Sequence, residues 1–141
     1  MISFNSSLKA ISIYLPEKVL TNENLNSEFP EWSIEKISNK VGINKRHISA
    51  TNEFVSDMAV RASENLFDEL NIRRTEIDFV LLCTQSPDYF LPTTACIVQH
   101  KLVLQKSCGA LDFNLGCSGY VYGLSLTKGL LLSGDAKIFL Q

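Results

Sequence analysis

Residues 78–84, which read DFVLLCT, limit the possible folds of this chain more than any other segment because they are almost continuously apolar. Such a run is typical of a strand covered on both faces, as in a parallel sheet. Similar runs occur at residues 110–114 and 136–141, and helical patterns separate the three. The order predicts an α/β layered domain with right-handed crossovers and a mostly parallel sheet.

Capping residues and apolar spacing predict the helices. Residues 118–133 are apolar on nearly all sides, which predicts a buried helix. Residues 9–14 (KAISIY) alternate polar and apolar side chains, which predicts a further strand. The expected helices are a short one capped by Thr21 and stopped by Pro30, residues 33–40 ending at Gly42, a longer one capped by Ser56 and running to about Asn71, one beginning near Thr93, and residues 118–133 ending at Gly134.

Length and charge place the chain among ordinary globular proteins. Its 141 residues suffice for one domain, and a net charge of -2 argues against a nucleic-acid or anionic membrane surface. Residues 1–16 lack a basic segment followed by a long apolar run, so we expect no signal peptide and a cytoplasmic location. A final strand without a following turn, and a buried helix with little to cover it, suggest that residues 1–141 are the N-terminal half-domain of a longer protein.

Four cysteines, Cys83, Cys96, Cys108 and Cys117, occur without any C-x-x-C pair, which favours free thiols. A zinc site would need ligands from distant segments, because the chain has only two histidines, His47 and His100. Cys96 and His100 share a predicted helix face and could form half of such a site, but a core cysteine beside a surface histidine is the simpler explanation. We therefore expect no metal.

Cys117 differs from the other thiols because it lies between glycines at a predicted strand-to-helix junction, NLGCSGY. We expect it in the first turn of a helix, where unpaired N–H groups stabilise a thiolate and lower its pKa. Gly116 and Gly119 would permit a tight turn and leave room for a substrate. The local pattern also fits a packed cysteine, and neither His47 nor His100 is well placed as a base. The partners of a catalytic Cys117 are expected beyond Gln141.

Several segments, in this order, resemble the N-terminal half of 3-oxoacyl-(acyl-carrier-protein) synthase III: YLPEKVLTNENL, GINKRHISATNEFVSDMA, SPDYFLPTTACIVQHKL and ALDFNLGCSGYVYGLSL. The resemblance implies the first half of a thiolase-like fold, with a mixed, mostly parallel five-stranded sheet and a buried central helix, truncated near the fourth strand. It also implies that Cys117 is the acyl-accepting nucleophile.

The resemblance further implies the reaction that initiates fatty acid biosynthesis. An acyl-CoA, commonly acetyl-CoA, acylates Cys117, and the acyl group then condenses with decarboxylating malonyl-acyl-carrier-protein to give a 3-oxoacyl product. The CoA thioester is a substrate, so no cofactor is expected, and the implied assembly is a homodimer. The catalytic His and Asn of the family lie in the second half, so the isolated chain is expected to be inactive.

Other site residues follow from the resemblance alone. Trp32 and Lys40 are matched with CoA contacts of the family, although Trp32 is shifted upstream and Lys36 occupies the aligned tryptophan position. A partly buried structural role for Trp32 is the competing interpretation. Leu91 holds the position of a bulky residue, often Phe, on a loop that reaches across the dimer and closes the acyl pocket of the partner.

Three alternatives remain open. A related starter condensing enzyme of secondary metabolism, or a protein like 3-hydroxy-3-methylglutaryl-CoA synthase, would use the same thiol on other acyl donors. The chain is also compatible with a non-catalytic half-domain. A cysteine hydrolase or thiol redox protein would need a local histidine or a resolving cysteine, which the spacing does not provide.

Overall fold

The structure, a computed structural model, describes residues 6–141 and divides them into two compact units. The smaller unit is Leu15–Glu53, and the larger consists of Phe54–Gln141 together with residues 6–14. The first five residues of the stretch in which no signal peptide is expected lie outside the described residues. Within residues 6–141, every helix is too short or too polar to cross a membrane.

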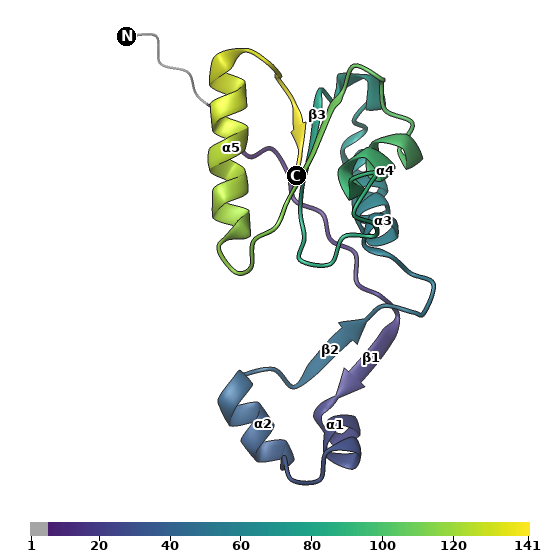
Figure 1. The fold of residues 1–141 in the computed structure, drawn as a ribbon, viewed down its shortest axis with the longest axis vertical. Helices are drawn as coiled ribbons and strands as arrows, with labels where there is room; N and C mark the ends of the chain where they lie inside the picture. Colours follow the sequence, from purple (N-terminus) through teal and green to yellow (C-terminus); the bar gives the residue numbers. More distant parts are fainter. Residues whose placement is uncertain (1–5) are drawn as a thin grey trace. The chain divides into compact units, whose positions relative to one another are not determined.

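The smaller unit contains two short strands and two short helices, which are labelled in Figure 1. The strands pair antiparallel, and Lys18 lies opposite Ile48. The sequence pattern does not predict this pair, because four-residue strands are too short for a clear alternation. The elements in chain order are β1 (Lys18–Thr21), α1 (Asn22–Glu28), α2 (Ile34–Val41) and β2 (Lys45–Ile48).

Both helices of the smaller unit begin and end as predicted. Thr21 caps α1, since its Oγ1 accepts a hydrogen bond from the Asn24 N–H at 3.3 Å. Gly42 ends α2 with a φ of 71°, a left-handed conformation that glycine adopts without strain. Asn22 is buried, and its Nδ2 donates to the Ile43 carbonyl at 3.0 Å. This side chain therefore ties the start of α1 to the segment that enters β2.

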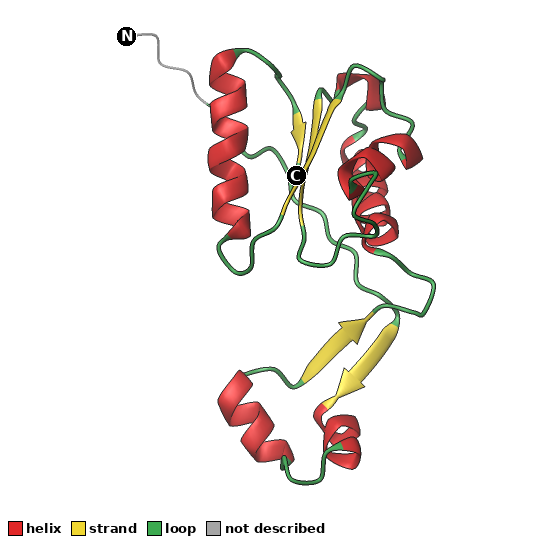
Figure 2. Cartoon of the chain, in the orientation of Figure 1, coloured by secondary structure: helices red, strands yellow, loops and turns green. Residues whose placement is uncertain are grey.

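The larger unit is a three-stranded parallel sheet with helices on both faces (Figures 1 and 2). Strand β3 is central and pairs parallel with both β4 and β5. Helices α3 and α4 lie on one face, and α5 lies on the other. The elements are α3 (Val55–Leu70), the 3-10 turn η1 (Arg74–Glu76), β3 (Phe79–Cys83), α4 (Thr94–Lys101), β4 (Gly109–Phe113), α5 (Gly119–Ser133) and β5 (Phe139–Leu140).

The predicted parallel α/β arrangement is confirmed, but the number of strands differs from the expectation. Among residues 6–141 the parallel sheet has three strands, and the antiparallel pair of the smaller unit is a separate sheet. The resemblance implies a mixed five-stranded sheet instead.

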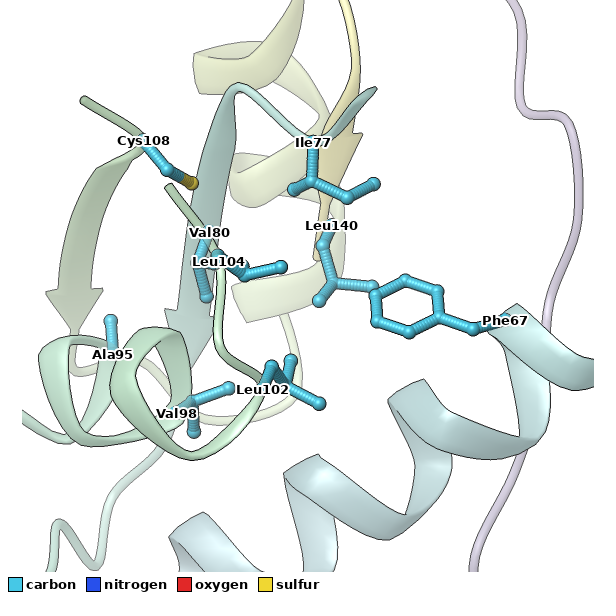
Figure 3. Close-up of a cluster of buried hydrophobic side chains, with 9 residues drawn as sticks. All are labelled: Phe67, Ile77, Val80, Ala95, Val98, Leu102, Leu104, Cys108 and Leu140. Carbon is cyan, nitrogen blue, oxygen red and sulfur yellow. The ribbon is translucent and has the colours of Figure 1, made fainter. Parts of the chain in front are cut away.

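The hydrophobic core of the larger unit lies between the sheet and helices α3 and α4 (Figure 3). Burial raises the pKa of the Cys108 thiol, and the nearby Asp78 carboxylate raises it further. Cys108 is thus a packing residue, as its sequence context suggests. The buried members are Phe67, Ile77, Val80, Ala95, Val98, Leu102, Leu104, Cys108 and Leu140.

Residues 9–14 do not form the predicted strand. They follow an irregular path in Figure 2, and the side chains of Ile11 and Ile13 are exposed. A side-chain amide, Asn65 Nδ2, donates to the Ile13 carbonyl at 3.1 Å. The alternation predicts two distinct faces, but a strand also needs a neighbouring strand, which residues 6–141 do not supply here.

Most of helix α5 is exposed within residues 6–141, although its pattern predicts a buried helix, one for which the sequence shows little to cover it. Its buried positions are Gly119 and Gly123, whereas Tyr120, Val121 and Tyr122 are 53%, 63% and 58% exposed. The glycines face the sheet, and no element of the described residues covers the opposite side of the helix. A helix that is apolar on all sides can be buried on all sides, but only where other parts of the protein cover it. The described part of the chain does not provide a surface that covers the outer side of α5.

The start of α3 depends on charged side chains, and Ser56 is not the N-cap that the sequence predicts. The N-cap is Phe54, whose N–H donates to Asp57 Oδ2 at 3.0 Å. Lys101 Nζ donates to the buried Ser56 Oγ at 2.7 Å and to Asp57 Oδ1 at 2.6 Å. The hydrogen bond from Lys101, and then that from Phe54, hold the pKa of Asp57 below its ordinary value of 3.8.

We expect acid to weaken the start of α3. Because the pKa of Asp57 is lower in the folded chain, its stabilising effect is present above 3.8 and is lost as the pH falls through the folded value. Both partners are partly exposed, so the effect on the free energy of unfolding should stay below about 1 kcal/mol. Urea unfolding at about pH 6 and about pH 3 measures it.

The Asp57→Asn variant should lose less stability on acidification than the wild type. Asp68→Asn, which changes an exposed carboxylate on the same helix, is the matched control and should behave like the wild type. An unchanged acid loss in Asp57→Asn would contradict the role of this carboxylate.

Candidate active site

The predicted nucleophile, Cys117, lies in the turn that connects β4 with α5. The Gly119 N–H donates to the Gly116 carbonyl at 2.8 Å and closes this turn. The sequence places Cys117 in the first helical turn, but the N-cap of helix α5 is Ser118, so Cys117 precedes the cap by one residue and lies outside the helix. The cysteine is exposed and free.

Two groups of Cys117 have no hydrogen-bond partner among residues 6–141, namely the thiol and the backbone N–H. An unpaired backbone N–H beside a nucleophile is the kind of donor that can stabilise an oxyanion. Exposure and free donors together leave the turn open to a carbonyl compound. The geometry is therefore compatible with nucleophilic chemistry.

Gly119 is required by packing, whereas Gly116 is not. A Cβ at position 119 would overlap Cys83 Sγ, which donates to the Leu115 carbonyl at 3.5 Å. A Cβ at position 116 would meet only the Gln85 side chain, at an ordinary 3.7 Å. Glycine at position 119 thus allows the start of α5 to lie directly on β3.

The remaining thiols have packing or surface positions. Cys83 is partly buried beneath the turn, Cys108 is in the core, and Cys96 is exposed on α4, where the Thr93 hydroxyl donates to its sulfur at 3.3 Å. Within residues 6–141, no three His, Cys, Asp or Glu side chains are grouped so as to hold a metal ion.

The two histidines have separate surroundings. In the smaller unit, His47 Nδ1 lies 2.6 Å from the Pro16 carbonyl oxygen. His100 is exposed in the last turn of α4, and no hydrogen bond joins it to the Cys117 thiol within the described part of the chain.

Trp32 and two lysines form an exposed cluster in the smaller unit. Lys36 Nζ lies 4.4 Å from the centroid of the Trp32 ring, and Lys40 Nζ lies 6.0 Å from it. Lys36 and Lys40 are four residues apart on α2, so they share one helix face. The structure thus brings Trp32 and Lys40 together, with Lys36 as a third member of this Trp32 cluster (Trp32, Lys36 and Lys40).

Leu91 lies in the loop between β3 and α4, which leaves the same edge of the parallel sheet as the turn that follows β4. The carboxyl ends of β3 and β4 lie at the same edge of the parallel sheet, and the Thr84 N–H donates to the Phe113 carbonyl at 3.2 Å. The three residues of the apolar loop tip are 58%, 96% and 73% exposed, and they are Tyr89, Phe90 and Leu91.

The chain is similar to curated and solved proteins over nearly its whole length, although no family model matches it. It is 41% identical over 135 residues to the beta-ketoacyl-(acyl-carrier-protein) synthase III of Xanthomonas oryzae pv. oryzae, covering 96% of this chain and 41% of that protein. The enzyme of that name from Clostridium perfringens is 41% identical over 133 residues, covering 94% and 40%.

Solved structures give the same result. A crystal structure of a 3-oxoacyl-(acyl-carrier-protein) synthase III has a TM-score of 0.87 and 51% identity, over 93% of this chain and 39% of the other. The synthase III of Thermus thermophilus has a TM-score of 0.87 and 32% identity, over 95% and 41%. OleA of Xanthomonas campestris, at 22% identity and a TM-score of 0.79, shares the fold.

The layered α/β unit with a cysteine at the β4–α5 turn is a fragment of a thiolase-like fold. Within that class, the chain is homologous to beta-ketoacyl-(acyl-carrier-protein) synthase III over nearly all of its residues. It spans about two fifths of the length of these relatives, 41% and 40% in the two cases above. The chain thus corresponds to one part of such a protein.

We expect Gly119→Ala to destabilise the larger unit and Gly116→Ala to have little effect. The new methyl group at position 119 must displace Cys83 or shift α5, a strain of about 1–3 kcal/mol. Thermal unfolding followed by circular dichroism measures both variants. Equal stability of the two variants would show that the contact between Gly119 and Cys83 is not tight in solution.

Proposed function

We propose that residues 1–141 are the N-terminal half-domain of a condensing enzyme of the beta-ketoacyl-(acyl-carrier-protein) synthase III type, with Cys117 as its nucleophile. The supporting observation is the exposed Cys117 in the turn between a parallel strand and a helix, with a thiol and an N–H that have no hydrogen-bond partner among residues 6–141. The homology to proteins of that name supports the same assignment.

In the proposed reaction, the Cys117 thiolate attacks the thioester carbonyl of an acyl-CoA, for which we propose acetyl-CoA. The backbone N–H of Cys117 stabilises the oxyanion, and CoA leaves with its sulfur and takes up a proton. Malonyl-acyl-carrier-protein then loses carbon dioxide, and the resulting carbanion attacks the acyl-cysteine carbonyl. The Cys117 thiolate is released, and the product is a 3-oxoacyl-acyl-carrier-protein that initiates fatty acid synthesis.

The proposed CoA contact is the Trp32 cluster. The exposed indole offers an apolar face for an adenine ring, and the ammonium groups of Lys36 and Lys40 offer charge for phosphates. Lysine provides a point charge without the bidentate geometry of arginine, so orientation would depend on stacking against Trp32.

The apolar loop tip is the proposed closing element of the acyl pocket in a homodimer. Leu91 is 73% exposed, which leaves it available to a second copy of the protein. Its side chain is smaller than the Phe that often holds this position in the family. The acyl chain length that this protein prefers is therefore determined by experiment and is not carried over from the family.

We expect acyl-CoA to acylate Cys117 covalently. The complete protein that carries this chain, incubated with acetyl-CoA and longer acyl-CoAs, should gain the mass of one acyl group, and Cys117→Ala should gain none. Cys83→Ala is the matched control, because it removes a partly buried thiol from the same region and should leave the adduct unchanged.

The preferred adduct identifies the starter acyl group. The isolated chain of residues 1–141 is expected to form no 3-oxoacyl product. The absence of any adduct in the complete protein would rule out the proposed function.

We expect Trp32→Ala to raise the KM for acyl-CoA about tenfold, through the loss of stacking against adenine, with kcat unchanged. Steady-state kinetics with acyl-CoA and with acyl-pantetheine, which lacks the adenine nucleotide, would measure the effect. Equal losses with both substrates would indicate a structural role for Trp32 instead.

A further inference from the structure

The loop between β3 and α4 is anchored at Asp88, immediately before its apolar tip. The Asp88 N–H donates to Thr94 Oγ1 at 3.0 Å, and Asp88 Oδ1 accepts a hydrogen bond from the Ser56 N–H at 3.0 Å. The loop is therefore held from two helices, since Thr94 begins α4 and Ser56 lies in the first turn of α3. The fixed residue is followed at once by Tyr89.

Asp112 fixes the start of α4 from strand β4. Its two carboxylate oxygens accept hydrogen bonds from the Thr94 N–H at 2.6 Å and the Ala95 N–H at 2.5 Å. A carboxylate that pairs with the first N–H groups of a helix satisfies them and interacts favourably with the helix dipole. The strand that carries Asp112 leads directly into the Cys117 turn.

Thr94 is the point where these contacts meet. It is fully buried, at 0% exposure. Its hydroxyl oxygen accepts a hydrogen bond from Asp88 in the loop, and its N–H donates a hydrogen bond to Asp112 on β4. Because water does not reach a buried hydroxyl, its removal leaves the Asp88 N–H without this partner. The contacts form one path from β4 through Thr94 to the residue before the loop tip.

We propose that Thr94 is a positioning residue that fixes the apolar loop tip on its own sheet and thereby determines, in the proposed homodimer, which acyl chains Cys117 of the partner subunit accepts. The proposal rests on the function proposed above, in which the tip closes an acyl pocket. Thr94 acts through Asp88 and does not itself contact substrate.

The test compares Thr94→Val, which keeps the shape and removes the hydroxyl, with Thr94→Ser, which keeps the hydroxyl. Rates of Cys117 acylation by acetyl-CoA and hexanoyl-CoA are measured in the complete protein by intact mass. We expect the ratio of the two rates to change about fivefold in Thr94→Val, the equivalent of one hydrogen bond, and to be restored in Thr94→Ser. Both rates falling in proportion, at an unchanged ratio, would overturn the proposal.

Two further measurements keep the test decisive. If Thr94→Val does not fold, Asp88→Ala releases the loop from α3 instead, and an unaltered ratio there would overturn the proposal. Hydrogen exchange of residues 85–92 reports the anchor without any substrate, and should be faster in Thr94→Val but not in Thr94→Ser. A wild type that is not acylated refutes the proposed function, and equal exchange in the three proteins refutes the anchor.

Discussion

The parallel pairing of β3 with β4 determines where every other part of the larger unit lies. Val80 is opposite Ala110 and Cys83 is opposite Phe113, so both strands end at the same edge of the sheet. The loop to α4 and the turn to α5 leave from that edge. A slip of one residue would move Asp112 to the other face of the sheet and separate it from the start of α4.

Sequence reasoning predicts those elements whose signals are local. Thr21 and Gly42 mark helix ends because a cap or a left-handed residue acts on its own neighbours. The apolar run of β3 likewise indicates a covered strand. Residues 9–14 show the limit, because their pairing depends on a strand that is not adjacent in sequence. The exposure of α5 shows the same limit, because the apolar pattern of a helix does not tell which other segments are present to cover that helix.

The candidate site divides in the same way. The position of Cys117 at a strand-to-helix junction follows from the flanking glycines, while the N-cap at Ser118 depends on turn geometry that the sequence leaves open. The association of Lys36 with Trp32 follows from helix spacing once α2 is known. The role of Asp112 has no local signal, because an acidic residue in a strand becomes a helix cap only through tertiary structure.

The contact between Gly119 and Cys83 couples two positions that are far apart in the sequence. The absence of a side chain at position 119 is matched by a sulfur atom on β3 that occupies the space beneath the turn. A larger residue at position 119 would require a smaller residue at position 83, so substitutions at the two positions are expected to occur together. Among relatives of this chain, substitutions at position 83 should therefore be correlated with substitutions at position 119, two residues after Cys117.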